Sequence, residues 1–146
     1  MDRDTEHALR QIYAETKTIA VVGASSDPDK AAHYIPRYLQ SQGYRIIPVS
    51  PKGGEILGER VRGSLSEIDE PVDVVDVFRP RREGVAIAKE AAKIGAKVLW
   101  FQPGTSSPEA TDAGDAADLL VVAEGCMGVL HGELGLGPGP YGDEAY

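Results

Sequence analysis

The sequence predicts an α/β fold: a Rossmann-like, doubly wound parallel sheet of about five strands in three layers, α/β/α. Short apolar runs rich in Val and Ile alternate with segments of about 10–14 residues that have helical spacing. The 146-residue chain is also long enough for one domain of this kind. Such alternation implies parallel strands joined by right-handed crossovers, most simply in the order third, second, first, fourth, fifth.

Each strand is predicted from an apolar run, and each helix from apolar residues at helical spacing. We expect the strands at 18–23, 44–49, 72–78, 97–102 and 119–123. We expect helices at 5–16, 29–42, 81–94 and 107–117, a hairpin at 55–61 and one helical turn at 64–68. Pro36 falls within the second helix, which therefore begins there or is kinked. Residues 1–131 are expected to form a single domain, and the Gly- and Pro-rich residues 132–146 an irregular or mobile tail.

Composition and charge exclude several classes of function. The formal net charge is −8, and no Lys or Arg follows Lys97. This argues against binding of nucleic acid or an acidic membrane through bulk electrostatics. No apolar run reaches the roughly 18–20 residues that span a bilayer. A single cysteine, Cys126, excludes an internal disulfide and fits a reducing compartment, so we expect a cytoplasmic protein.

The turn after the first strand, residues 23–30, has the composition of a phosphate-binding loop. Glycine, small residues and hydroxyls let backbone N–H groups approach a phosphate in front of a helix N-terminus. The alternative is a plain strand-to-helix turn capped by Ser or Asp. The segment is neither a GxGxxG fingerprint nor a Walker A loop. The candidate residues are Gly23, Ala24, Ser25, Ser26 and Lys30.

The turn after the second strand discriminates between nucleotides. A site for NAD usually has Asp or Glu here, bonded to the ribose hydroxyls. This chain instead has Val49, Ser50, Pro51 and Lys52, with no carboxylate and one cation. A lysine at this place fits an additional phosphate on the ribose, as in NADP or in the 3′-phosphate of coenzyme A.

The turns after the third and fourth strands add a guanidinium and aromatic rings. Arg79 lies between the strand end and Pro80, where its guanidinium is available to phosphate or adenine. Arg81 and Arg82 are expected on the solvated first turn of the next helix. Trp100, before the fourth turn, is expected in the core. Lys30, Lys52 and Arg79 thus follow three different strands whose carboxyl ends meet at one edge.

With these turns assembled, the chain resembles the CoA-binding domain family. This Rossmann-like module is found alone in small bacterial proteins and as the N-terminal domain of the succinyl-CoA synthetase α subunit. The likeness is carried by residues 21–25 with Lys30, by 48–58, by 73–80, by 98–104 and by 121–127. Its most specific part is the Pro-x-x-Pro-Lys-Gly-Gly stretch at 48–54.

The resemblance implies coenzyme A as the cofactor. In that family the first turn holds the CoA phosphates, the Pro-Lys segment contacts the nucleotide end, and later turns line the pantetheine path. Carried onto this sequence, the implied ligand residues are Gly23, Ser25, Ser26, Lys30, Val49, Ser50, Pro51, Lys52, Phe78, Arg79, Pro80 and Gln102. The phosphorylated histidine of the synthetase lies in a second domain, and none of His7, His33 or His131 has a matching setting. Ligase chemistry is therefore not implied.

The sequence offers few candidates for catalytic residues. The chain has no HExxH, CxxC or GxSxG motif and no His or Cys cluster with metal spacing, so we assign no catalytic residue and no metal. Cys126 is interpreted as a packing residue, with a mixed disulfide to a CoA thiol as the alternative. Three hypotheses follow: a CoA or acyl-CoA binding module without catalysis, an NADP-dependent oxidoreductase, and an interaction subunit with a vestigial pocket for an unknown protein partner.

Overall fold

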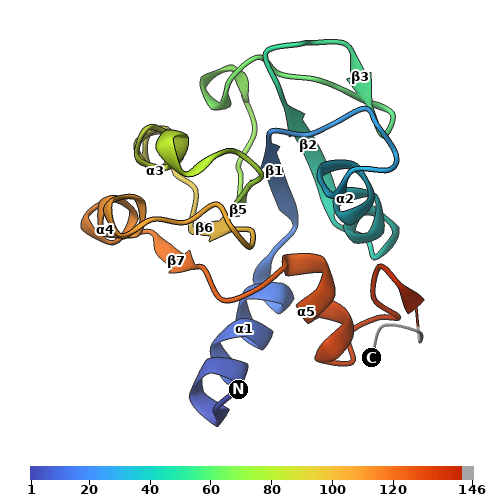
Figure 1. Cartoon of the computed structure of the whole chain (residues 1–146), viewed down its shortest axis with the longest axis vertical. Coiled ribbons are helices and arrows are strands. Elements are labelled where there is room, and N and C mark those ends of the chain that lie inside the picture. Colours follow the sequence, from blue (N-terminus) through green and yellow to red (C-terminus); the bar gives the residue numbers. More distant parts are fainter. Residues whose placement is uncertain (143–146) are drawn as a thin grey trace.

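The computed structural model describes residues 1–142 and has the predicted α/β/α fold (Figure 1). Within these residues, five parallel strands form one sheet: β1 (Thr18–Val22), β2 (Arg45–Val49), β5 (Val74–Val77), β6 (Val98–Phe101) and β7 (Leu120–Val122). The helices are α1 (Arg3–Glu15), α2 (Ala31–Ser41), α3 (Gly84–Lys93), α4 (Pro108–Ala116) and α5 (Met127–Glu133). The smaller elements are the antiparallel pair β3 (Glu55–Ile56) and β4 (Glu59–Arg60), and the 3₁₀ turns η1 (Leu65–Glu67) and η2 (Arg81–Glu83).

The strand order is β2-β1-β5-β6-β7, so the parallel strands run second, first, third, fourth, fifth. The predicted order was wrong because it placed the third strand outside the second. Arg62, just after β4, occupies that place: its N–H donates to Pro48 at 3.0 Å, and its carbonyl accepts from the N–H of Ser50 at 2.9 Å. The third parallel strand, β5, therefore pairs with the free side of β1. The order reverses between β1 and β5, which puts the turns after these two strands side by side.

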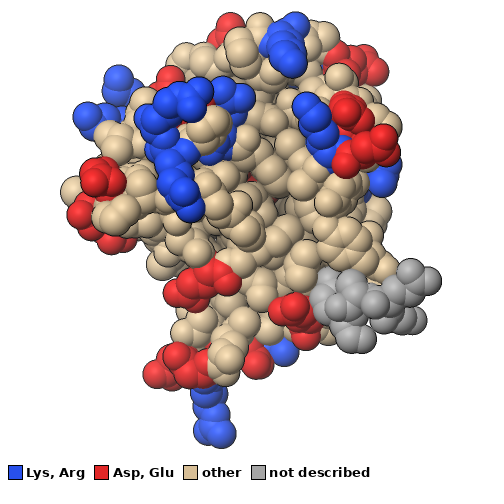
Figure 2. Space-filling view, viewed as in Figure 1, with Lys and Arg blue, Asp and Glu red and all other residues tan. Residues whose placement is uncertain are grey.

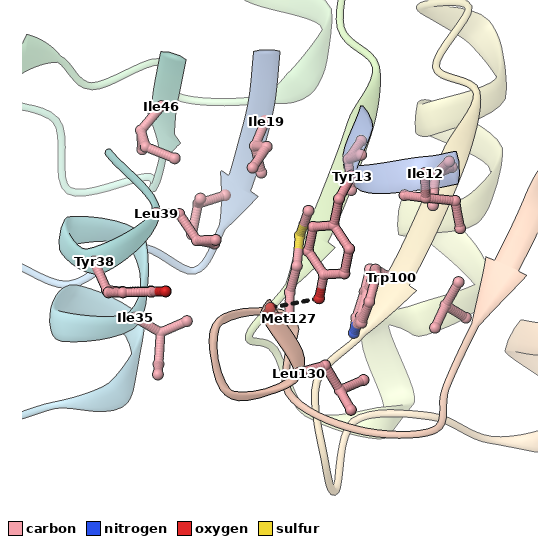
Figure 3. Close-up of a cluster of buried hydrophobic side chains, with 14 of the residues drawn as sticks. Ile12, Tyr13, Ile19, Ile35, Tyr38, Leu39, Ile46, Trp100, Met127 and Leu130 are labelled. Carbon is pink, nitrogen blue, oxygen red and sulfur yellow. Dashed lines mark hydrogen bonds between the residues drawn. The ribbon is translucent and has the colours of Figure 1, made fainter. Parts of the chain in front are cut away.

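The two faces of the sheet bury separate cores. Helices α1, α2 and α5 cover one face, and α3 and α4 cover the other (Figure 1). Figure 3 shows the first core, where the Tyr13 hydroxyl donates to the carbonyl of Met127 at 2.6 Å. Trp100 is fully buried in the same core, as predicted, and its indole N–H donates to the Gly125 carbonyl at 2.8 Å. These two bonds attach the start of α5 to α1 and β6.

Pro36 lies inside α2 and not at its start. Because proline has no N–H, the carbonyl of Ala32, one turn earlier, lacks its usual helical donor. The N–H of Ser25 supplies that donor, with an N···O distance of 3.2 Å. The gap in the helical bonding therefore ties the turn after β1 to α2.

Helix α5 was absent from the predicted elements. It packs against α2, where the hydroxyl of Tyr38 bonds Nδ1 of His131 at 2.7 Å and accepts from the N–H of Gly139 at 2.9 Å. Residues 134–142, part of the predicted tail, consist of turns and bends, and Leu134 among them is buried. Residues 143–146 of that tail lie outside the described part. Within residues 1–142, no helix is long and apolar enough to cross a membrane.

Candidate functional site

The turn after β1 is held in shape by its own groups. Gly23 has φ +91°, and a Cβ there would lie 2.6 Å from the carbonyl oxygen of Phe78, so only glycine fits without a shift. The Ser25 hydroxyl accepts from the N–H of Asp27 at 3.1 Å. Nδ1 of His33, in the first turn of α2, donates to the Ser25 carbonyl at 2.7 Å. His33 thus helps to fix the loop.

The N-terminus of α2 faces the turn without a capping side chain. Lys30 is the N-cap, its side chain forms no capping bond, and the first turn contains no acidic residue. Among residues 1–142, no group accepts from the N–H of Ala31 or Ala32. Unpaired N–H groups at the positive end of a helix dipole attract anions.

A cleft of about 260 Å³ lies in front of this helix end. Three separate turns line it: the turn after β1, the turn after β2 and the turn after β5. The lining residues are Gly23, Ala24, Ser25, Lys30, Ala32, Ser50, Pro51, Lys52, Phe78 and Arg79. The sequence prediction that Lys30, Lys52 and Arg79 meet at one edge is therefore seen in the structure. We call this space the anion cleft.

A second cleft of about 280 Å³ adjoins the first on the α3 side of the sheet. Its lining is largely apolar, with Val22, Val49, Leu65, Ala86 and Ile87, and it shares Gly23, Ser50, Pro51 and Arg79 with the anion cleft. Glu83, at the end of η2, and Glu90, in α3, also line it. We call it the apolar cleft. The two clefts together form a continuous site, polar on one side and apolar on the other.

Arg79 stands at the boundary of the two clefts. Its guanidinium Nη2 lies 2.6 Å from Oε2 of Glu83, and its Nε lies 3.1 Å from Oε1 of the same carboxylate. This hydrogen-bonded pair raises the pKa of Arg79 and lowers the pKa of Glu83. Both side chains remain partly exposed. The cation predicted for ligand binding is therefore engaged by an acid of the chain itself.

The family follows from a sequence match over most of the chain. Residues 17–132 match the CoA binding domain. The chain belongs to this family.

Relatives of this CoA binding domain include free-standing proteins of nearly the same length. Protein YneT of Bacillus subtilis is 36% identical over 131 residues, which cover 90% of this chain and 97% of YneT. A hypothetical protein of Pyrococcus horikoshii has a solved structure that superposes with a TM-score of 0.87 at 39% identity, covering 90% of this chain and 92% of that one. The domain thus occurs as a small protein in its own right.

A similar domain also occurs inside a longer enzyme subunit. The α subunit of ADP-forming acetate–CoA ligase I of Pyrococcus furiosus is 35% identical over 89 residues. The match covers 57% of this chain and only 19% of that subunit. The likeness to the ligase therefore concerns one part of its chain.

Four predicted ligand residues of the CoA binding domain do not line the anion cleft. Ser26 and Pro80 are exposed next to it, and Val49 lines the apolar cleft. Gln102 is buried, and its Nε2 donates to Oδ1 of Asp76 at 2.6 Å. The side chain of Gln102 is thus directed into the interior, although the family resemblance had implied a place on the ligand path.

Asp76 is a buried carboxyl that the sequence analysis did not single out. It is fully buried in β5, and its Oδ2 has no hydrogen-bond partner among the described residues. Burial raises the pKa of Asp76 to about 7, and the bond from Gln102 opposes that rise. A lone acidic residue within the apolar run 74–78 was the available sequence signal.

Glu83 was also missed, because residues 81–83 were interpreted as a solvated helical turn. Its spacing of four from Arg79 would have indicated the pair only if the helix began earlier. Cys126 is partly buried against the core of the α1 face, and burial raises the pKa of its thiol, as does the nearby Asp76. Within residues 1–142, no cluster of three His, Cys, Asp or Glu is placed to hold a metal ion.

Proposed function

We propose that this CoA binding domain binds coenzyme A or an acyl-CoA across the two clefts at the carboxyl ends of its strands. The observation that carries the proposal is the convergence of Lys30, Lys52 and Arg79 from three turns on one cleft at an uncapped helix N-terminus. Cations and free N–H groups together suit a ligand with several phosphate oxygens. Membership of the family supports coenzyme A as that ligand.

The two clefts differ in the parts of the ligand that they suit. The phosphates fit the anion cleft, where the N–H groups of Ala31 and Ala32 and the two lysines are available. The adenine ring fits the apolar cleft, because a flat ring gains from burial against Val49 and Ile87. Pro51 and Arg79 line both spaces and would contact the ligand at the crossing.

The chain carries no assigned catalytic group, so the proposal is a binding module. The single cysteine fits a reducing compartment such as the cytoplasm, where such ligands occur. NADP remains the competing ligand, since it too carries a ribose phosphate. An interaction subunit with a vestigial pocket is the third hypothesis, and it predicts that none of these nucleotides binds.

Isothermal titration calorimetry of the purified chain with CoA, acetyl-CoA and NADPH tests the proposal. We expect heat with CoA or acetyl-CoA and a native mass spectrum that shows one adduct of the ligand's mass. If NADPH binds and neither CoA compound does, the proposal is wrong. If none of the three binds, the vestigial-pocket hypothesis takes its place.

Lys52→Ala and Lys30→Ala each remove a cation from the anion cleft. We expect each to weaken CoA binding about tenfold, because a lost charge-assisted contact to phosphate costs about 1.4 kcal/mol or more. Lys89→Ala is the matched control, since Lys89 is exposed on α3 and lines neither cleft. If the wild type and both cleft variants bind CoA with equal affinity, the two lysines do not contact the ligand.

A further inference from the structure

The position of Arg79 makes its charge available to either cleft. Its side chain crosses directly over the turn after β1, where a Cβ on Gly23 would lie 2.7 Å from the Arg79 Cδ. The guanidinium lines both the anion cleft and the apolar cleft. Arg81, two residues later, donates instead to the carbonyl of Ser106 at 2.9 Å. Among the arginines at 79–82, Arg79 is therefore the one that lines the site.

Glu83 already forms an ion pair with this guanidinium. Three donor–acceptor distances of 2.6, 3.1 and 3.2 Å join the two side chains, so the carboxylate takes both Nε and Nη2 of Arg79. A phosphate group would use the same fork of donors. The ligand and Glu83 are thus alternative partners for one cation.

The pair is weak enough to exchange. Its side chains are 41% and 36% exposed, and ion pairs of this exposure are readily given up to a competing anion. Glu83 is also the residue that precedes α3, and its side chain makes no capping bond there, so the helix does not hold the carboxylate in place.

We propose that Glu83 tunes the affinity of the site for phosphate ligands by competing with ligand phosphate for Arg79. The inference rests on the proposed function. A ligand whose phosphate reaches Arg79 displaces Glu83 and gains the guanidinium, whereas a ligand without such a phosphate leaves the pair closed. Glu83 therefore lowers the affinity for a ligand whose phosphate reaches Arg79, and it keeps weaker anions from binding this guanidinium.

A double-mutant cycle with CoA as the titrant tests the competition. We expect Glu83→Gln to tighten CoA binding about three- to fivefold, which is the range for release of a partly exposed ion pair. Arg79→Ala should weaken binding, and adding Glu83→Gln to Arg79→Ala should change the affinity less than about twofold. The coupling between the two substitutions is the signature of one shared guanidinium.

Glu109→Gln is the control for simple loss of negative charge, because Glu109 is exposed in the first turn of α4 and lines neither cleft. If Glu109→Gln tightens binding as much as Glu83→Gln does, or if the gain from Glu83→Gln persists without Arg79, competition for the guanidinium is refuted. Circular dichroism melts of each variant establish that the fold is intact. Absence of CoA binding by the wild type would count against the proposed function instead.

Discussion

Asp76 is a buried carboxyl in the central strand of the sheet. It lies on β5 in register with Val21 of β1 and Trp100 of β6, and Nε2 of Gln102, just after β6, donates to its carboxyl. Burial favours the neutral acid, which raises the pKa to about 7. The charge of this group therefore changes near neutral pH, although no solvent reaches it.

Asp76→Asn should change how stability depends on pH. Because the folded pKa lies above the unfolded value of 3.8, the unfolded chain releases the proton first as pH rises. Stability from this group is complete below about pH 3.8 and is lost as pH rises through about 7, on the order of 4 kcal/mol in all. The asparagine variant should lose much less stability between about pH 5 and pH 8.

Urea unfolding at several pH values measures this difference, with Asp115→Asn, exposed on α4, as the control. A variant whose stability falls as steeply as the wild type's over that range would mean that Asp76 is not the titrating group.

The positions of the three cations could be predicted from the sequence, because only the ends of the strands had to be located. Lys30, Lys52 and Arg79 follow strands whose carboxyl ends must share an edge of a parallel sheet. Gln102 follows such a strand too, but its side chain turns inward, and that depends on the unforeseen partner Asp76. Residue positions could be predicted from the sequence, whereas side-chain partners could not.

Helix α2 holds the turn after β1 at one end and the last helix, α5, near the other. Its N-terminus faces the anion cleft, and Pro36 leaves the Ala32 carbonyl to the loop residue Ser25. Near its other end, Tyr38 bonds His131 of α5 and Gly139 beyond it. The loop and the last helix are therefore both fastened to the same helix.

Pro36→Ala should have opposite effects on the stability of α2 and on the order of the turn after β1. The new N–H would compete for the Ala32 carbonyl, so α2 should be as stable as before or more so. The Ser25 N–H would lose its partner, and we expect CoA binding to weaken about threefold or more. Thermal melts and calorimetry measure the two effects. Pro108→Ala, at the start of α4, serves as the control, and unchanged CoA affinity in Pro36→Ala would contradict the role given to Ala32.

The elements with strong periodicity were predicted, and α5 was not. Its sequence, residues 127–133, includes two glycines, which have low helix propensity. The helix is held by tertiary contacts with Tyr13 and Tyr38, which lie more than 90 positions away in the sequence. The prediction of the strand order was wrong for a similar reason, because no local sequence signal indicates the contact of Arg62 with β2.

Across the whole molecule, the positive charges are unevenly distributed, although the net charge is negative. Figure 2 shows Lys and Arg gathered over α3 and the segment that enters it, while Asp and Glu are scattered over this face, several of them around α1. The chain carries −8 overall and has no Lys or Arg after Lys97, so α4, β7 and α5 have none. The negative net charge opposes the approach of a polyanion, and the Lys and Arg side chains that line the anion cleft offset this locally.

Binding of CoA should therefore weaken as salt is added. Raising the salt from about 50 mM to about 500 mM screens exposed charges beyond a few ångströms, and we expect an affinity loss of about tenfold. Calorimetry at several salt concentrations measures it. The slope should be shallower for Lys52→Ala than for the wild type, and a wild-type affinity independent of salt would exclude contacts between these cations and the ligand.

Trp100 has an optical consequence. It is the single tryptophan of the chain, it is fully buried beside Tyr13 with a ring separation of 5.8 Å, and its N–H is bound to Gly125 next to α5. Its fluorescence is therefore that of a shielded indole, and it lines neither cleft. We expect its emission to change when the chain unfolds, so this tryptophan reports on folding, whereas ligand binding in the clefts is followed by calorimetry or mass spectrometry.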